Sequence, residues 1–111
     1  MLAINDVEVA KALRFVRENA CRGIQVSDVL AQTVHSPSTL ERRIKSLFGR
    51  SLKSEITRVK VDSAKLLLQE TNLKISQIAM RTGFSEPKYF SEVFRSVQGV
   101  TPTMYRKQFL E

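Results

Sequence analysis

Apolar residues recur at intervals of three and four positions along most of this chain, which is the spacing of one face of an α-helix. The first such segment runs from Asp6 to Ala20 and ends at Arg22-Gly23. Its apolar face is made of Val9, Ala12, Leu13, Val16 and Ala20. The most strand-like string, residues 65–68, lies inside a longer helical period. The pattern therefore predicts an all-α chain with about seven helices and no sheet.

Ser, Thr and Pro mark the expected helix starts. Ser36-Pro37 and Thr101-Pro102 each place a capping residue before a proline at the first helical position. The helix that follows Thr101 is expected to end near Leu110. The other candidate N-caps are Ser27, Ser76 and Ser85, the last of them followed by Pro87 in the first turn.

An internal repeat gives these helices an order. Residues 26–36 align without gaps on residues 75–85, and each copy runs into a second apolar-periodic segment that ends at a glycine, Gly49 or Gly99. The residues expected to face inward are Leu40, Ile44 and Leu47 in the first copy and Phe90, Phe94 and Val97 in the second. A short helix, a tight turn and a second helix are the outline of a helix-turn-helix, so the sequence predicts two of them.

The longest expected helix lies between the two copies, from Leu52 to Glu70. Its apolar stripe is Leu52, Ile56, Val59, Ser63, Leu66 and Leu67. At about 1.5 Å per residue it would be roughly 28 Å long. Helices that read successive major grooves on one face of DNA lie roughly 34 Å apart, so this length suits a linker between two readers. We expect a homeodomain-like pair, with a first lobe over residues 1–51, a linker helix over 52–70 and a second lobe over 71–111.

The charge of the chain points to a polyanionic partner. The 111 residues carry 18 basic and 11 acidic side chains, a net charge of +7. The excess is shared between the halves, because residues 1–55 hold 9 basic and 6 acidic side chains and residues 56–111 hold 9 and 5. A single basic tail is therefore excluded, and two helix-turn-helix units in a basic chain suggest a DNA duplex that is bound at two places.

Other functional classes find little support. No apolar run approaches the length of about 18 residues that a membrane span needs, so a cytoplasmic protein is expected. The single cysteine, Cys21, cannot form an internal disulfide, and it has no acid or His beside it that would activate it as an alkyl acceptor in DNA repair. With one His and no Cys/His cluster, we expect no metal, no other cofactor and no enzyme activity.

The second helix of each unit is the expected reader, since the major groove admits one α-helix whose exposed side chains reach the base edges. The exposed face is predicted to carry Ser38, Glu41, Arg42 and Lys45 in the first unit and Lys88, Ser91, Glu92 and Arg95 in the second. Arg42 is the best candidate for a bidentate contact to guanine, and Glu41 and Glu92 could accept from the cytosine amino group.

Flanking basic residues are expected to contact the phosphates. The candidates are Arg43, Lys45, Arg50, Lys53, Arg58, Lys74, Arg81 and Arg95.

Simpler interpretations stay open for several of these residues. Ser38-x-x-Glu41 is also a capping-box pattern, and Glu92 lies one helical turn after Lys88, where the two could pair. Cys21 suits a small buried residue at a helix end, and His35 suits packing in a turn. The aromatic residues, which could resemble a base-stacking platform, have the spacing of a core instead: Phe84, Tyr89, Phe90, Phe94 and Tyr105.

Three segments of the chain carry residues at characteristic spacings: Ser36-x3-Leu40-x3-Ile44-x4-Gly49, Arg58-x5-Ala64-Lys65-x-Leu67-Leu68, and Ile75-x2-Ile78-Ala79-x3-Gly83-Phe84-x5-Phe90-x3-Phe94-x4-Gly99-x-Thr101-Pro102-x2-Tyr105-Arg106. In these segments the chain resembles the DNA-binding domain of AraC/XylS-type bacterial transcription regulators, and the resemblance covers nearly its whole length, residues 9–109. Within that family, residues 20–24 and Val29-Leu30 look most like the regulators of xylose operons.

The resemblance implies that two helix-turn-helix lobes bind adjacent major grooves as one asymmetric unit. By family position, the base readers would be Ser38, Glu41 and Arg42 in the first lobe and Lys88, Ser91 and Glu92 in the second. It also implies transcription activation through RNA polymerase, a location at the bacterial nucleoid and a separate effector-sensing domain on the N-terminal side. Dimerisation would belong to that domain, so the isolated chain is expected to be monomeric.

The first lobe departs from the second at two positions. Leu30 stands where the second copy has Ala79, and Val34 stands where it has Gly83. If the turn needs a positive φ, a β-branched residue is costly there. We therefore expect an altered turn in the first lobe.

The leading hypothesis is sequence-specific binding of double-stranded DNA by a regulator of sugar catabolism, xylose-like in type. The alternative is a basic helical module that docks an acidic protein, such as a polymerase subunit, without reading DNA. Two matched helix-turn-helix units favour the first hypothesis, because a docking surface has no need of two readers.

Overall fold

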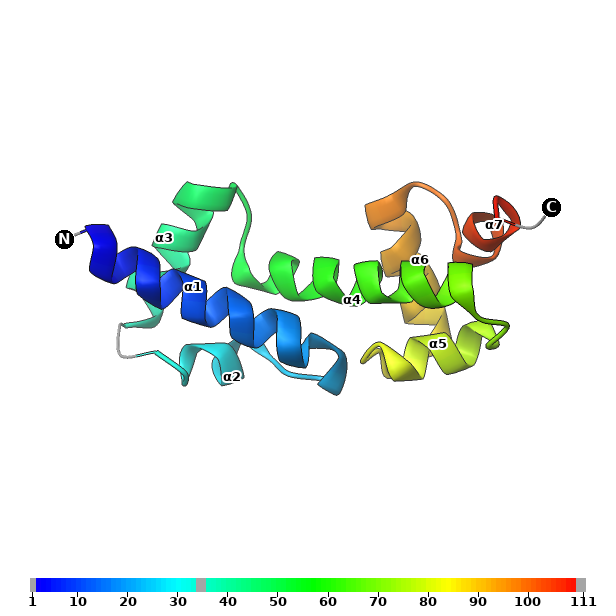
Figure 1. The fold of residues 1–111 in the computed structure, drawn as a ribbon, viewed down its shortest axis with the longest axis horizontal. Helices are drawn as coiled ribbons and strands as arrows, with labels where there is room; N and C mark the ends of the chain where they lie inside the picture. The colour runs from blue at the N-terminus through cyan, green and yellow to red at the C-terminus, as the bar shows by residue number, and fades with distance from the viewer. Residues whose placement is uncertain (1, 34–35, 110–111) are drawn as a thin grey trace. The chain divides into compact units, whose positions relative to one another are not determined.

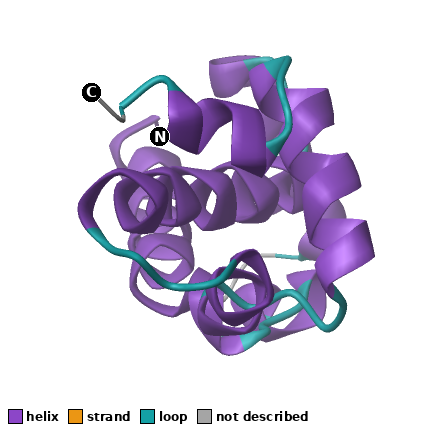
Figure 2. Ribbon diagram, turned by 90° about the vertical axis from the view of Figure 1, so that its right-hand side faces the viewer, coloured by secondary structure: helices purple, strands orange, loops and turns teal. Residues whose placement is uncertain are grey.

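The structure is a computed structural model that describes residues 2–33 and 36–109, with side chains for 7–33, 36 and 38–109. Within these ranges every regular element is helical, as Figures 1 and 2 show, and the predicted all-α class is confirmed. The helices are α1 (Leu2–Asn19), the short 3₁₀ helix η1 (Ala20–Arg22), α2 (Val26–Leu30), α3 (Pro37–Phe48), α4 (Leu52–Glu70), α5 (Ile75–Arg81), α6 (Pro87–Gln98) and α7 (Pro102–Lys107).

The chain forms two compact units that divide α4 between them. The first unit contains residues up to 20 and residues 24–59, and the second contains residues 21–23 and the chain from residue 60 onward. The bounds predicted for α4, Leu52 to Glu70, are confirmed. Each unit includes part of the helix that the sequence suggests as a separate linker.

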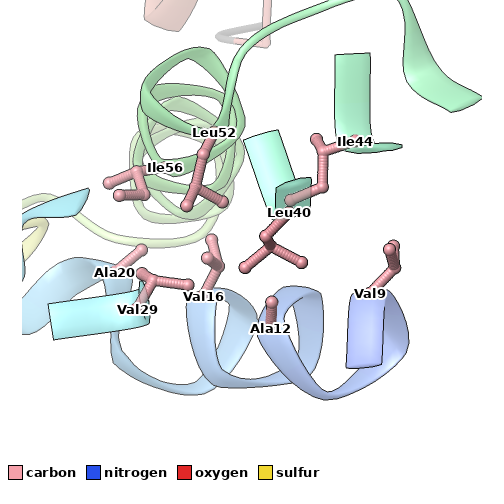
Figure 3. Packing of buried hydrophobic residues seen from close by; sticks show 9 residues of the cluster. All are labelled: Val9, Ala12, Val16, Ala20, Val29, Leu40, Ile44, Leu52 and Ile56. Carbon is pink, nitrogen blue, oxygen red and sulfur yellow. The ribbon is translucent and has the colours of Figure 1, made fainter. Parts of the chain in front are cut away.

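The first core is aliphatic. In Figure 3, Val9, Ala12 and Val16 of α1 point toward Leu40 of α3, and Leu52 of α4 lies across from them. Among the residues whose side chains are described, the buried members of this core are Val9, Ala12, Val16, Ala20, Val29, Leu40, Ile44, Leu52 and Ile56. Burying each larger side chain contributes about 1.5–3 kcal/mol, so α1, α2, α3 and the start of α4 are held by one shared core.

The second core is built around aromatic rings. Ring centroids are 5.1 Å apart between Phe84 and Phe90, 5.8 Å between Phe90 and Phe94, and 5.5 Å between Phe94 and Tyr105. The rings are tilted or edge-on, which is the favourable geometry for aromatic pairs. The aliphatic members are Val61, Ala64, Leu68, Ile78 and Ala79. The predicted aromatic core is confirmed for four of its five residues, Phe84, Phe90, Phe94 and Tyr105.

Four residues predicted to be buried are exposed instead. Leu47 and Val97, at equivalent points of α3 and α6, are 46% and 40% exposed because each lies in the last turn, beyond the part of the helix that reaches its core. Leu66 is 56% exposed, since the second half of α4 buries Val61, Ala64 and Leu68. Tyr89, predicted to be in the core, is 53% exposed.

The two predicted Ser/Thr caps that precede Pro are confirmed. The Ser36 hydroxyl accepts from the Thr39 backbone N–H at 3.3 Å, and the Thr101 hydroxyl accepts from that of Met104 at 3.2 Å. The helix after Thr101 ends at Lys107, and Leu110 lies outside the described residues.

Ser27, Ser76 and Ser85 are not N-caps. The N-caps of α2, α5 and α6 are Gln25, Lys74 and Glu86. In the two shorter helices the third residue provides the polar partner instead. Asp28 accepts from the Gln25 N–H at 2.7 Å, and Gln77 accepts from the Lys74 N–H at 3.0 Å. This return bond from the third helical residue is one half of a capping box, and it satisfies the N–H of the N-cap residue itself.

The repeat extends further than the sequence alignment indicates. Gly49 and Gly99 end α3 and α6 with φ of 74° and 89°, a left-handed conformation that favours glycine. Two residues later, Ser51 caps α4 by accepting from the Ser54 N–H at 3.2 Å, as Thr101 caps α7. The start of α4 in the first unit is therefore the counterpart of α7 in the second.

The turn between α5 and α6 is fixed by a Schellman motif. The Phe84 N–H donates to the Ala79 carbonyl at 2.9 Å, and the Gly83 N–H donates to that of Met80 at 3.3 Å. Gly83 has φ of 88°, so the condition from which an altered first turn is expected, a positive φ at this position, holds in the second unit. The buried Thr82 hydroxyl donates to the Ile78 carbonyl at 2.7 Å and closes the end of α5.

Lys60 of α4 contacts the turn between α5 and α6 through its side chain. Its ammonium donates to the Gly83 carbonyl at 3.1 Å and lies 5.0 Å from the centre of the Phe84 ring. Burial lowers the pKa of Lys60, because desolvation disfavours the charged amine, and the nearby Cys21 acts in the opposite direction. A lysine of the long helix thus helps to set the position at which the chain enters α6.

Arg106 of α7 binds backbone carbonyls at the C-terminal end of α4. Its guanidinium donates to the backbone carbonyls of Leu68 at 3.2 Å, Thr71 at 3.2 Å and Leu73 at 2.7 Å. These carbonyls belong to the last turn of α4 and the loop that follows, where helix carbonyls lack partners within the helix. Gln69 donates to the Tyr105 hydroxyl at 2.7 Å and adds a further bond between the two helices.

We predict that Arg106→Met lowers the free energy of unfolding of the second unit by about 2–3 kcal/mol, because three carbonyls lose a charged donor at once. Both tyrosines, Tyr89 and Tyr105, lie in this unit and the chain has no Trp, so tyrosine fluorescence during urea unfolding reports on it specifically. Lys107→Met is the matched control, since Lys107 is the exposed neighbour of Arg106 on the same helix. An equal loss in both variants would contradict the prediction.

We also predict that the Lys60 amine titrates below its ordinary pKa of 10.5. Because the pKa is lowered in the folded state, the unfolded chain keeps the proton longer, and this group adds stability as pH rises from the lowered value toward 10.5. NMR titration of the Lys60 side chain would measure the midpoint in the folded chain and in concentrated urea. A midpoint that does not rise on unfolding would show that burial has no such effect.

Candidate nucleic-acid interface

The second helix of each helix-turn-helix presents a polar face next to its buried one. In α3 the buried positions are Leu40 and Ile44, while Ser38, Arg42 and Lys45 are exposed. In α6 the buried positions are Phe90 and Phe94. Each reader helix is thus anchored on one side by its own core and leaves the other side open to a ligand.

The predicted readers of α6 are available to different degrees. Lys88 and Glu92 are exposed, and Ser91 is half-buried. No ion pair joins Lys88 to Glu92 within the described chain, so the simpler interpretation of Glu92 as an intrahelical partner of Lys88 finds no support. An acid on a basic surface is better suited to a cytosine amino group than to a phosphate.

Glu41 differs from the other predicted readers. It is half-buried, and its carboxylate accepts from the backbone N–H of Leu52 at 3.3 Å. The capping-box interpretation, with Ser38 as the N-cap, is wrong because the N-cap of α3 is Ser36. The carboxylate is therefore bonded at the start of α4 and not at the start of its own helix.

The predicted phosphate contacts divide into exposed and half-buried residues. The exposed ones are Lys45, Lys53, Arg58, Lys74, Arg81 and Arg95. Arg43 and Arg50 are half-buried, and Arg50 pairs with Glu55. Arg50 has to release this partner, or share its charge, before it can bind a phosphate.

Two exposed residues on the reader helices were missed by the sequence analysis. Thr39 is the third residue of α3, and Tyr89 is the third residue of α6. They are 50 residues apart, as are the buried Leu40 and Phe90 that follow them. An alignment of the two copies on Leu40 and Phe90 would have placed both residues in the first turn of their helices. The N-terminal residues of a recognition helix are the ones that contact base edges.

The turn of the first helix-turn-helix is described only in part. Helix α2 ends at Leu30, and the Thr33 hydroxyl donates to the Leu30 carbonyl at 3.2 Å, as Thr82 does to the equivalent carbonyl in the second unit. The equivalent of Leu30, Ala79, is followed by two more helical residues in α5. Val34 and His35, on which the expected altered turn and the expected turn-packing role depend, lie outside the described residues.

In the described part of the chain, no group of three or more His, Cys, Asp or Glu side chains could hold a metal ion. None of the helices in that part of the chain is long and apolar enough to cross a membrane. Cys21 is half-buried, between an exposed and a fully buried environment.

Comparison with known proteins gives a consistent result. Residues 30–108 match a family described as a helix-turn-helix domain. The Escherichia coli K12 xylose operon regulatory protein is 35% identical over 104 residues, which cover 94% of this chain and 26% of that protein. The chain therefore spans about a quarter of the length of the curated relatives that it matches first.

Solved structures agree with the family match. An AraC-type DNA-binding domain-containing regulator from Chromobacterium violaceum has a TM-score of 0.88 at 26% identity, over 98% of this chain and 97% of that one. The DNA-binding domain of the global transcriptional factor AdpA, solved with a target DNA, has a TM-score of 0.84 at 26% identity and covers 91% of each chain. The matches support DNA binding over the alternative of a docking module without DNA readout. This chain belongs to the AraC-type family of helix-turn-helix DNA-binding domains.

Proposed function

We propose that this domain binds double-stranded DNA at specific sequences for a bacterial transcription regulator, with α3 and α6 each entering a major groove. The observation that carries the proposal is the pair of reader helices, each with a buried apolar face and an exposed polar face. The net charge of +7 supplies the attraction to phosphates that any such binding requires.

The proposed base contacts follow from the chemistry of the exposed side chains. Arg42 and Lys88 would donate to the O6 and N7 of guanine, and Glu92 would accept from the N4 of cytosine. Ser38 and Ser91 can donate or accept and would contact either type of base edge. The exposed basic residues Lys45, Lys53, Arg58, Lys74, Arg81 and Arg95 would contact phosphates, with Arg43 and Arg50 as further candidates.

The role of the parent protein is a separate proposal, because this chain spans only part of its relatives. Similarity to a xylose operon regulatory protein supports regulation of a sugar-catabolism operon at the bacterial nucleoid. We propose that activation uses a contact with RNA polymerase and that an effector-sensing domain lies on the N-terminal side. Dimerisation would then belong to that domain, and the isolated chain would be a monomer.

Selection of bound sequences from a random duplex pool tests the proposed function. We expect two short enriched boxes about one helical turn apart, because each reader helix specifies its own box. Anisotropy titration of the selected duplex should show an affinity that falls steeply with salt, as counterions are released from the phosphates. Enrichment of a single box would mean that one unit reads alone, and no enrichment would contradict specific binding.

We predict that Arg42→Ala weakens binding to the selected site by about 1–3 kcal/mol and relaxes the preference at one base pair. Arg17→Ala is the matched control, since Arg17 is also exposed but lies on α1, outside the reader helices. Titration on the selected and on random duplexes separates the two kinds of contact. An equal loss on random DNA would identify Arg42 as a phosphate contact.

A further inference from the structure

Glu41 makes a contact that none of the other predicted readers makes within the described chain. It lies on the reader helix α3, yet its Oε1 accepts from the Leu52 N–H at 3.3 Å, eleven residues further along the chain. Leu52 is fully buried and is the first residue of α4. The hydrogen bond therefore joins the reader helix to the start of the next helix within the first unit.

The start of α4 needs such an acceptor. The first backbone N–H groups of a helix have no partner within the helix, and they carry the positive end of its dipole. The Ser51 hydroxyl accepts from Ser54, the third residue of α4. The N–H of the first residue, Leu52, is taken by the Glu41 carboxylate, whose negative charge is favoured at a helix N-terminus.

The second unit shows why the acceptor is absent there. Counting 50 residues along the repeat, the counterpart of Leu52 is Pro102 and the counterpart of Glu41 is Ser91. Proline has no backbone N–H, so the start of α7 leaves no donor at this position that needs a partner. In the first unit the backbone N–H of Leu52 is matched by an acid on the reader helix, Glu41. In the second unit Pro102 has no N–H, and Ser91 stands at the position of that acid.

We infer that Glu41 is a positioning residue, which fixes α3 against the start of α4, and that it is not one of the base readers. The inference builds on the proposed function, because it assigns the reading of the first box to the exposed face of α3. On that face Ser38 and Arg42 remain for the base edges, together with the exposed Thr39, whose hydroxyl also accepts from the Ser36 hydroxyl at 2.8 Å. Glu41 acts on recognition through the placement of Arg42, the next residue of the same helix.

Hydrogen exchange of the Leu52 amide, followed by NMR in the free domain, tests the contact directly. Glu41→Met keeps the length of the side chain but removes the acceptor, and we expect the Leu52 amide to exchange about fivefold faster, the effect of losing one cap. Glu41→Gln keeps an acceptor oxygen, so exchange should stay near the rate of the unchanged chain. Glu92→Met and Glu92→Gln are matched controls in the second unit and should leave Leu52 unaffected.

Sequence selection with the two Glu41 variants tests whether Glu41 reads a base. A positioning residue predicts that the Glu41→Gln variant selects the same first box as the unchanged chain. It also predicts that the Glu41→Met variant binds that site more weakly and relaxes the preference at the Arg42 base pair, without a new preferred base. A base reader predicts that Glu41→Gln changes a preferred cytosine to adenine, since a glutamine side chain pairs with adenine N6 and N7. A changed base, or a Leu52 amide that exchanges equally in the Glu41→Met variant, would overturn the inference.

The two readouts also separate this inference from the proposed function. Amide exchange is measured without DNA, so it shows whether Glu41 bonds the Leu52 N–H whether or not the domain binds DNA specifically. A pool in which the unchanged chain enriches no sequence would count against specific DNA binding and leave the exchange result standing. The outcome that supports the positioning role is a Leu52 amide that exchanges at the unchanged rate in the Glu41→Gln variant and faster in the Glu41→Met variant.

Discussion

Both units depend on the apolar residues of α4. Leu52 and Ile56 belong to the first core, and Val61, Ala64 and Leu68 belong to the second. The other helices that contact these cores are shorter, and helices of 5 to 12 residues such as α2, α3, α5, α6 and α7 are not stable alone in water. The folding of each helix-turn-helix therefore requires that half of α4 be helical at the same time.

The second requirement concerns the polar groups at the helix ends. Short helices have many ends, and each end leaves backbone groups without partners in the helix. In the second unit, side chains from α4 and α7 supply several of these partners. Lys60 donates to the Gly83 carbonyl before α6, and Arg106 donates to three carbonyls after Leu67. The position of α6 is thus set by hydrogen bonds as well as by the aromatic core.

The sequence was sufficient for features that depend on local order. The bounds of α4, the caps at Ser36 and Thr101 and the positive φ at Gly83 all follow from residues that are close in the chain. Features that depend on distant residues were missed. The Glu41, Lys60 and Arg106 bonds join residues 11, 23 and 33–38 positions apart, and no spacing rule indicates them.

Errors in the predicted core have the same origin. A helical period identifies the face of Leu47 and Val97 correctly, but it does not indicate where along the helix the core ends. Tyr89 was assigned to the core with the other aromatic residues because of their spacing, but it is 53% exposed while its neighbour Phe90 is fully buried. The base contacts of the reader helices stay predictions, because exposure makes a side chain available but does not identify its partner.

The internal repeat also limits how far a role can be transferred between the units. Gly49 and Gly99, or Ser51 and Thr101, have the same role because backbone geometry requires it at both places. Glu41 and Ser91 are equally equivalent in position, yet Leu52 has an N–H to be satisfied and Pro102 has none. The freedom of a reader-helix residue to contact DNA therefore depends on the first residue of the following helix. Two units with the same backbone outline can present different sets of base-reading positions for this reason alone.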